Sequence, residues 1–312
     1  MEVPVYLFTG FLDSGKSTFI QDTLRDPQFH NQEKTLLLLC EEGEVSFDSS
    51  VMADYHVDIV TVEKESDLTY EFLCELQRRY QPQRVMIEFN GMWKVTDFLD
   101  VEYPIEWILV QIMTTIDAST FALYMNNMRS LVYEQVVHSE LIIFNRCDNS
   151  TKKSFLRGNV KAINAKAQII YEGVDGSINQ LADDVLPFDK NSDMLTVESG
   201  DYGLWYMDIM EKPQSYEGKT VTFEAQVVEV DRFHQDVFLI GREAMVCCAD
   251  DIQMIGFVVH YAKSTQLKSG QWVRLQAKVH CEYDQQYDGI VPVLYAVSVN
   301  SCNALDDYVT FS

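Results

Sequence analysis

The residues best suited to chemistry stand near the start of the chain. Residues 10–17 read Gly-Phe-Leu-Asp-Ser-Gly-Lys-Ser, a full match to the pattern G-x-x-x-x-G-K-[ST]. In such a loop the glycines let successive backbone N–H groups point at phosphate oxygens. Lys16 would reach the β- and γ-phosphates, and the Ser17 hydroxyl would bind Mg²⁺. The pattern predicts a nucleotide site made by Gly10, Leu12, Asp13, Ser14, Gly15, Lys16, Ser17 and Thr18.

The elements on either side of this loop support the prediction. An apolar run, Val3 to Phe8, precedes it, and a helical pattern, Thr18 to Leu24, follows it. A strand, a glycine-rich turn and a helix are the context that the motif requires. The positive N-terminal end of the helix would add to the attraction of phosphate.

A second candidate group follows the apolar run Val85–Phe89. Glu88 lies near the carboxyl end of this expected strand, and Gly91 follows closely. A carboxylate there can hold Mg²⁺ through a water molecule, and the Gly91 N–H can donate to a γ-phosphate. We therefore assign catalytic roles to Lys16 and Glu88, with Glu88 orienting the metal or the attacking water.

A third group would recognise the base. The run Leu141–Phe144 leads into Asn145-Arg146-Cys147-Asp148, which is close to the guanine-recognition element Asn-Lys-x-Asp. The Asp148 carboxylate can accept two hydrogen bonds, from the N1–H and the 2-amino group of guanine. Adenine lacks this pair of donors, and an unpaired carboxylate costs about 1–3 kcal/mol. Asn145, Arg146 and Asp148 thus predict GTP as the ligand, with the Arg146 stem packing on the base in place of lysine.

Two patterns of apolar residues along the sequence indicate which elements position these groups. Up to about residue 185, short apolar strands alternate with amphipathic helices such as Asp67–Tyr80 and Thr120–Val136. This predicts an α/β fold of the P-loop NTPase class with a mostly parallel sheet, and ligands at the carboxyl ends of its strands. Later runs are β-rich with glycine punctuation, which predicts a small OB-like β-barrel. The expected domains are residues 1–186 and 203–312, joined by a linker at 187–202.

Charge and composition restrict the possible partners. The chain of 312 residues has 48 acidic against 24 basic side chains, a formal charge of −24. That field repels nucleic acid and anionic lipid, so we expect no nucleic-acid partner. No apolar run reaches the roughly 20 residues of a membrane helix, so we expect no integral membrane protein. Seven scattered cysteines without a secretory signal favour reduced thiols and a cytoplasmic location.

Taken in order, these motifs resemble the CobW-type GTPases, relatives of the HypB and UreG nickel-site maturation proteins. The resemblance covers about residues 1–185. It is carried by Thr9-Gly10-Phe11-Leu12, Glu42-Gly43-Glu44 with Asp48, Glu88-Phe89-Asn90-Gly91, Asp117-Ala118, Asn145 to Asp148, and Asn164-Ala165-Lys166-Ala167. It implies a GTPase that delivers or inserts metal ions under the control of GTP. An unidentified client metalloprotein or transporter would then be its partner.

The chain departs from that family at two places. Asp13 stands where the family has glycine, which puts a carboxylate near the phosphates. The Cys-x-Cys-Cys metal motif of the family is absent, and Val62-Glu63-Lys64-Glu65-Ser66 stands in its place. Two glutamates there could bind a hard cation, although solvated glutamates are the commoner case. The residues therefore favour a GTPase more strongly than a thiolate metal chaperone.

The second domain offers other candidate metal ligands. Cys247 and Cys248 precede two aspartates, and His260 and His280-Cys281 lie on later expected strands. Together these could bind Zn²⁺ or another transition metal. The alternative is that the adjacent cysteines alternate between core and surface on one strand. About residues 200–312 resemble the soluble C-terminal domain of YcgQ-like membrane proteins, which implies little chemistry.

Two functions of different class remain open. The first is a Mg²⁺-dependent GTPase that acts as a switch in metal trafficking or metalloprotein assembly. Its intrinsic turnover would be slow, because no arginine finger is identifiable within the chain. The alternative is a non-hydrolysing nucleotide-binding adaptor with a β-barrel docking domain. A phosphotransferase on the same fold would need a second, basic substrate pocket, which the sequence does not indicate.

Overall fold

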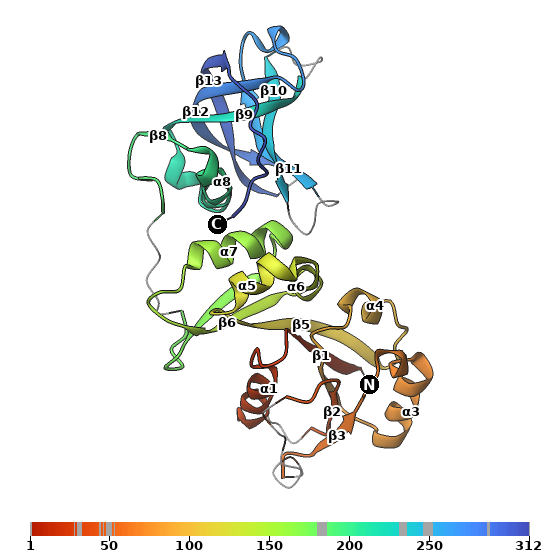
Figure 1. Cartoon of the computed structure of the whole chain (residues 1–312). Helices are drawn as coiled ribbons and strands as arrows, with labels where there is room; N and C mark the ends of the chain where they lie inside the picture. The colour runs from red at the N-terminus through yellow and green to blue at the C-terminus, as the bar shows by residue number, and fades with distance from the viewer. Residues whose placement is uncertain are drawn as a thin grey trace. The chain divides into compact units, whose positions relative to one another are not determined.

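A computed structural model of the chain describes residues 2–27, 29, 33–43, 45, 47, 52, 54–179, 186–230, 236–245, 252–285 and 288–311. The chain divides into two compact units (Figure 1). Unit one is Met1–Thr151 with Ile163–Ala182, and unit two is Lys152–Ala162 with Asp183–Ser312. The domain boundaries expected from the sequence stay a prediction.

Unit one is built on a parallel β-sheet. Among the described residues, seven strands pair in the order β3-β2-β4-β1-β5-β6-β7, and every pairing is parallel. The strands are β1 (Val3–Thr9), β2 (Thr35–Leu39), β3 (Val57–Thr61), β4 (Arg84–Glu88), β5 (Trp107–Asp117), β6 (Leu141–Cys147) and β7 (Gln168–Gly173). The predicted P-loop NTPase fold with a parallel sheet is thereby confirmed.

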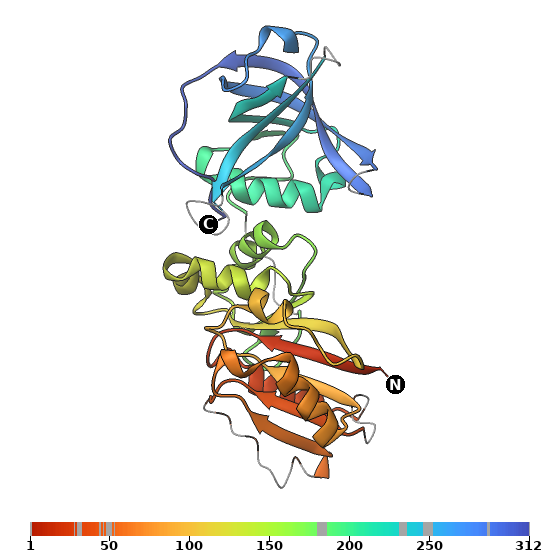
Figure 2. The same ribbon diagram turned by 90° about the vertical axis from the view of Figure 1, so that its right-hand side faces the viewer.

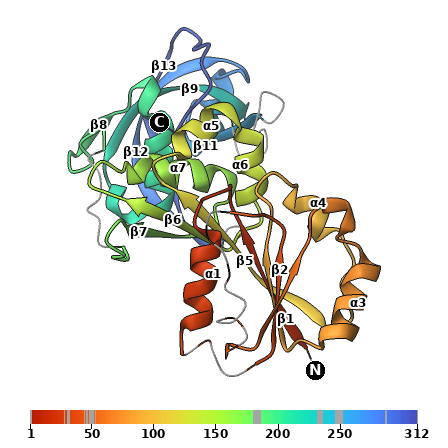
Figure 3. The same ribbon diagram turned by 60° about the horizontal axis from the view of Figure 1, so that its bottom comes forward.

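Helices cover both faces of this sheet. In Figure 3, α1 (Lys16–Arg25) lies on one face, and α3 (Tyr70–Tyr80) and α4 (Val95–Leu99) lie on the other. Successive residues of a strand point to opposite faces of the sheet and pack in different hydrophobic clusters. Phe8 packs in the cluster with Ile20, and Leu7 packs in the cluster with Leu73. No helix in the described part of the chain has the length and apolar character that a membrane span requires.

One expected helix is in fact two. The segment Thr120–Val136 forms α5 (Phe121–Asn127) and α6 (Arg129–Val136), which are separated at Met128. Met128 has φ −138° and ψ 37°, outside the helical range. Asn126 and Asn127 before it are weak helix formers, which explains the break. α6 is therefore a separate helix, and its Gln135 is buried.

Parallel pairing brings the ends of the strands to one edge. The chain leaves β1 at Thr9, β4 at Glu88, β5 at Asp117 and β6 at Cys147, and all four strands point the same way. The predicted phosphate loop, carboxylate and base-recognition residues therefore share the edge where parallel sheets bind ligands.

Unit two contains a closed β-barrel, as predicted. In its described residues, β9 (Thr220–Val230), β10 (Val237–Met245), β11 (Ile252–His260), β13 (Gly289–Ser301) and β12 (Trp272–Asp284) pair in that order. Pairing of β9 with both β10 and β12 closes the barrel. The short strand β8 (Met194–Thr196) adds to β9 in parallel. This is the five-stranded, OB-like arrangement (Figure 2).

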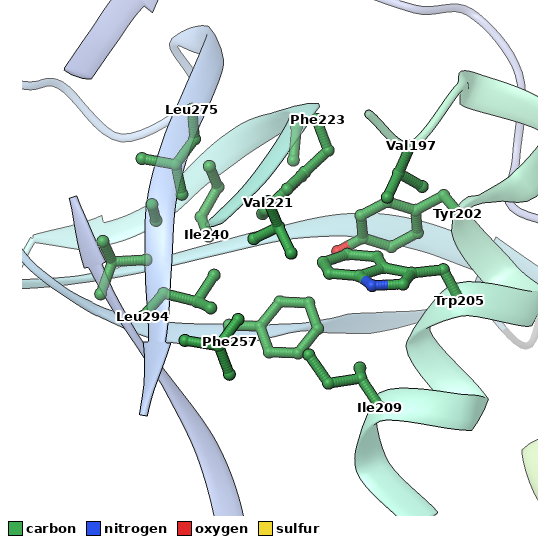
Figure 4. Packing of buried hydrophobic residues seen from close by; sticks show 14 of the residues in the cluster. Val197, Tyr202, Trp205, Ile209, Val221, Phe223, Ile240, Phe257, Leu275 and Leu294 are labelled. Atoms are coloured by element: carbon green, nitrogen blue, oxygen red, sulfur yellow. The ribbon is translucent and has the colours of Figure 1, made fainter. Parts of the chain in front are cut away.

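A helix that the sequence pattern did not predict contributes side chains to the barrel core. α8 (Tyr202–Glu211) buries residues on several faces, so its sequence lacks a polar stripe. Trp205 is fully buried, with its ring 5.0 Å from that of Phe223 and 5.1 Å from that of Phe257 (Figure 4). α7 (Lys153–Ile163) also contributes to this unit, because Asn159 Nδ2 donates to the Phe311 carbonyl at 3.2 Å.

Candidate functional site

The loop between β1 and α1 has the backbone that the glycine pattern predicts. Gly10 (φ 126°) and Gly15 (φ 98°) adopt positive φ values that favour glycine. A Cβ on Gly10 would lie 2.2 Å from the Thr115 carbonyl oxygen, so a larger residue is excluded. Asp13 also has a positive φ, 59°, at the position where the resemblance expects glycine. The loop thus tolerates aspartate in a left-handed conformation that costs about 1–2 kcal/mol.

Lys16 is held inside this loop by three acceptors. Its Nζ donates to the carbonyls of Gly10 at 2.8 Å and Phe11 at 2.9 Å. It also donates to Glu41 Oε2 at 2.6 Å, an ion pair whose side chains are 2% and 10% exposed. The Glu41 carboxylate is therefore the anionic partner of the ammonium.

Ser17 and Glu88 form the neighbouring contact. Ser17 Oγ donates to Glu88 Oε1 at 2.7 Å, and Glu88 is buried. Burial raises the pKa of Glu88, and the nearby Glu41 carboxylate adds to this, while Ser17 and Lys16 act in the opposite direction. Glu88 Oε2 is buried, and it has no hydrogen-bond partner among the residues that the structure describes. A carboxylate oxygen left over beside a serine hydroxyl fits a hard cation such as Mg²⁺.

The loop after β4 packs directly on the phosphate loop. A Cβ on Gly91 would lie 2.5 Å from the Gly10 carbonyl oxygen and 2.7 Å from the Phe11 Cα, so only glycine fits there. Asn90 Nδ2 donates to the Cys40 carbonyl at 3.1 Å, which ties the same loop to the end of β2. Gly91 therefore packs against the phosphate loop, and its contact with a γ-phosphate stays a prediction.

The base-recognition residues also contact the phosphate loop. Asn145 Nδ2 donates to the Ser14 carbonyl at 2.6 Å. Arg146 Nη1 donates to the Asp13 carbonyl at 2.9 Å and to Asp117 Oδ2 at 2.5 Å. Burial raises the pKa of Asp117, but hydrogen bonds from Ser119 and Arg146 outweigh it and the net pKa is lowered. Asp117 is therefore an ionised partner that holds Arg146 over the loop.

Two adjacent pockets open on these residues. The smaller, about 80 Å³, is lined by Leu12, Asp13, Gly15, Lys16, Ser17, Thr18, Glu41, Gly43, Val45, Glu88 and Arg146. The larger, about 230 Å³, is lined by Gly15, Thr18, Phe19, Asp22, Thr115, Ile143, Asn145, Arg146, Glu172, Gly173, Val174 and Gly176. Gly15, Thr18 and Arg146 line both. The arrangement suits phosphates in the first pocket and a base with its ribose in the second.

Asp148 is set apart from this group. It lines neither pocket, and its Oδ1 accepts hydrogen bonds from the Ser150 N–H at 2.8 Å and the Ser150 hydroxyl at 2.6 Å. These bonds lower the pKa of Asp148. The carboxylates that do line the larger pocket belong to Asp22 and Glu172. Guanine recognition by Asp148 stays a prediction.

Two residues of the site were not predicted from the sequence. Glu41 pairs with Lys16, and Gln135 Oε1 accepts the Gly10 N–H at 2.9 Å. Glu41 lies directly before the Glu42-Gly43 pair that carries part of the family resemblance, so its position was a usable signal. Gln135 lies inside a helix with no motif around it, and nothing in the sequence distinguishes it.

The predicted transition-metal ligands are not gathered in what the structure describes. Cys247 and Cys248 lie outside the described residues. The rings of His260 and His280 each pack on Tyr295, at 4.7 and 4.9 Å between centroids, and Cys281 N–H donates to Glu217 Oε2 at 2.6 Å. Among the described residues, no three histidine, cysteine, aspartate or glutamate side chains converge on a metal-sized site.

Comparison with known families assigns both parts of the chain. Residues 4–171 match the model described as the CobW/HypB/UreG nucleotide-binding domain. Residues 175–310 match the model described as the DUF1980 C-terminal domain. Both resemblances suggested by the motifs are confirmed.

Individual relatives are distant. The UPF0703 protein YcgQ of Bacillus subtilis (strain 168) is 21% identical over 99 residues, which are 32% of this chain and 35% of that protein. This chain therefore spans about a third of the length of that curated relative. Zn(II)-bound YjiA GTPase from E. coli is 17% identical, with a TM-score of 0.44, over 87% of this chain and 89% of its own. The hydrogenase maturation factor HypB from Archaeoglobus fulgidus is 15% identical, with a TM-score of 0.38, over 56% and 82%.

Proposed function

Because the chain belongs to the CobW/HypB/UreG family of nucleotide-binding domains, we propose that it is a Mg²⁺-dependent GTPase acting as a switch in metal trafficking or metalloprotein assembly. The observation that carries the nucleotide site is the first turn of α1. There a buried lysine and a serine lie side by side, and the serine contacts a buried carboxylate that has a spare oxygen. That combination is what a triphosphate and its cation require.

Each residue has a distinct task in this proposal. Lys16 releases Glu41 and neutralises charge on the β- and γ-phosphate oxygens, while the loop amides bind the remaining oxygens. Ser17 and Glu88 would hold Mg²⁺, directly or through water. The cation, when bound, neutralises charge that develops on the phosphates.

Catalysis in this site depends on position and charge more than on proton transfer. Gly91 presents its N–H toward the γ-phosphate, and Glu88 orients the water that attacks it. Arg146 is occupied by Asp117 and the Asp13 carbonyl, so it serves the base and the loop instead of the transferred phosphate. Without an arginine supplied to the γ-phosphate, turnover by the isolated chain would be slow.

The metal-handling part of the proposal rests on family membership and on the attached barrel. YjiA, a solved structure similar to this chain, is a Zn(II)-bound GTPase. Cys247 and Cys248 stay candidate ligands for Zn²⁺ or a similar ion. A client metalloprotein or transporter would meet the chain in its nucleotide-bound state.

A non-hydrolysing adaptor is the second candidate, and two carboxylates favour it. Asp13 lines the phosphate pocket, and Glu41 occupies the ammonium of Lys16. Both oppose a bound triphosphate, so nucleotide could bind weakly and turn over hardly at all. The barrel would then act as the docking module.

Phosphate release separates these functions. The purified chain is incubated with Mg²⁺ and either GTP or ATP, and Lys16→Ala serves as the control. Release from GTP that the substitution abolishes supports the GTPase. Binding of GTP with no release above the Lys16→Ala background supports the adaptor, and release from ATP alone contradicts the assigned base.

A further inference from the structure

One buried side chain joins the two loops that would surround the γ-phosphate. Gln135, on α6, accepts the Gly10 N–H with Oε1 at 2.9 Å. Its Nε2 donates to the carbonyls of Gly91 at 3.2 Å and Trp93 at 3.4 Å. The carboxamide thus uses its acceptor on the phosphate loop and its donor on the loop after β4. A single planar group therefore links both loops.

The backbone of Gln135 is itself fixed. Its carbonyl oxygen accepts hydrogen bonds from the hydroxyls of Thr9 at 3.3 Å, Thr114 at 2.7 Å and Ser139 at 2.9 Å. All four residues are at most 2% exposed. Thr9 ends β1 and Thr114 lies in β5, so the sheet itself holds this point of α6. A buried polar group that loses its hydrogen bond costs free energy of folding, so this network resists rearrangement.

Residues of α6 and of the turn after it also contact Thr96, which follows Trp93 in the sequence. Glu134 Oε2 accepts the Thr96 N–H at 3.4 Å and the Thr96 hydroxyl at 3.0 Å. His138 Nε2 lies 3.3 Å from that hydroxyl. Glu134 and Gln135 of α6, and His138 in the turn after it, therefore contact the segment from Gly91 to Thr96. Of these three residues, Gln135 also contacts the phosphate loop.

We propose that Gln135 is a positioning residue that couples occupancy of the phosphate loop to the Gly91–Trp93 segment, an inference that rests on the proposed nucleotide site. Gly91 already packs on Gly10 so closely that no Cβ fits between them. A phosphate that accepts hydrogen bonds from the loop amides shifts the Gly10 peptide. The Gln135 carboxamide then moves with Gly10 and displaces the Gly91 and Trp93 carbonyls, to which it donates. The phosphate pocket and the Gly91–Trp93 segment then move together.

Two variants separate this role from support of the fold. Gln135→Glu keeps the acceptor for the Gly10 N–H and loses the donor to Gly91 and Trp93, while Gln135→Leu loses both. Gln77→Leu is the matched control, because Gln77 Oε1 also accepts one hydrogen bond, from Trp107 Nε1 at 2.7 Å, at another part of the same unit. Thermal unfolding identifies any variant that does not fold.

The reporter is Trp93 itself, one of four tryptophans in the chain. With 5-fluorotryptophan incorporated, the ¹⁹F resonance missing from Trp93→Phe belongs to this residue. We expect GTP–Mg²⁺ to shift that resonance in the wild type and in Gln77→Leu. In Gln135→Glu we expect GTP affinity within about threefold of wild type, no shift of the resonance, and at least a tenfold loss of turnover at saturating GTP.

The outcomes are distinct. If both Gln135 variants bind GTP as tightly as the wild type and show the same shift of the Trp93 resonance, the coupling is overturned and the proposed function stands. A wild-type chain that binds no GTP overturns the proposed function and this inference with it. Loss of the shift in Gln77→Leu as well would also overturn the coupling, because the effect would then come from general loosening of the unit.

Discussion

Lys16 and Glu41 form an ion pair inside the phosphate loop. The 2.6 Å contact between Lys16 Nζ and Glu41 Oε2 is largely shielded from water, and it occupies the ammonium that a triphosphate would use. The carboxylate therefore acts as an internal substitute for a phosphate oxygen. Nucleotide has to displace it, and displacement would move the residues that follow β2.

Replacing Glu41 by glutamine should strengthen nucleotide binding. The substitution removes the competing charge, and a hydrogen bond to a charged group contributes about 1.5–3 kcal/mol. We expect GTP affinity to rise roughly tenfold in calorimetric titration, together with a lower melting temperature of the free chain. Glu42→Gln makes the same charge change at an exposed neighbour and should alter neither. Unchanged or weaker affinity in Glu41→Gln would refute the competition.

Asp13 should limit nucleotide binding in two ways. Its carboxylate lines the phosphate pocket, and its φ of 59° suits glycine better. Asp13→Gly is expected to stabilise the chain by about 1 kcal/mol and to bind GTP several-fold more tightly. Asp13→Asn keeps a residue that tolerates this conformation and removes only the charge. If Asp13→Asn binds a fluorescent GTP analogue no better than wild type, charge repulsion is excluded.

Asp148 offers a test of base recognition. If its carboxylate reads the N1–H and 2-amino donors of guanine, Asp148→Asn should weaken GTP binding by about 1–3 kcal/mol. The same variant should gain affinity for xanthosine triphosphate, whose 2-carbonyl can accept from the asparagine amide. Competition binding with both nucleotides measures the exchange. Equal preferences in wild type and variant would move base recognition to the other acids of the larger pocket, Asp22 and Glu172.

The raised pKa of Glu88 predicts opposite effects of pH on stability and on binding. Burial makes the folded chain hold this proton more tightly than the unfolded chain does. Its contribution to stability is therefore present below the ordinary carboxyl range and is lost as pH rises through the folded pKa. Mg²⁺ and nucleotide need the ionised carboxylate, so their affinity should rise over the same range.

Glu88→Gln checks both halves of that prediction. Without nucleotide, this variant should melt at a higher temperature than wild type near neutral pH, and the difference should shrink as the pH falls. Its affinity for GTP–Mg²⁺ should be low and should lose the pH dependence assigned to Glu88. A wild-type affinity that is flat in pH would show that this carboxylate does not titrate in the binding reaction.

Much of the architecture followed from local patterns. The strand–loop–helix frame around Gly10 and Gly15 was predictable because phosphate loops require glycine at sharply turned positions. The parallel sheet followed from short apolar strands alternating with helices. The barrel followed from β-rich runs, but α8 was missed because a helix buried on several faces, such as the one carrying Trp205, shows no amphipathic period.

The unpredicted parts of the site depend on contacts between residues far apart in sequence. Gln135 accepts the Gly10 N–H across 125 positions of sequence, and α6, which carries it, is a separate helix that the sequence did not distinguish from α5. Glu41 is one of several acidic residues in its segment, and its pairing with Lys16 depends on the end of β2 lying beside the loop. Neither relation leaves a periodic trace in the sequence.

The account depends most on Lys16 as the anchor of a bound triphosphate. Calorimetric titration of GTP with Mg²⁺ into the wild-type chain and into Lys16→Ala tests this directly. We predict saturable binding of about one nucleotide per wild-type chain, and a loss of at least about 2 kcal/mol of binding free energy in the variant. Equal heats from the two proteins, or none from the wild type at millimolar GTP, would contradict the account.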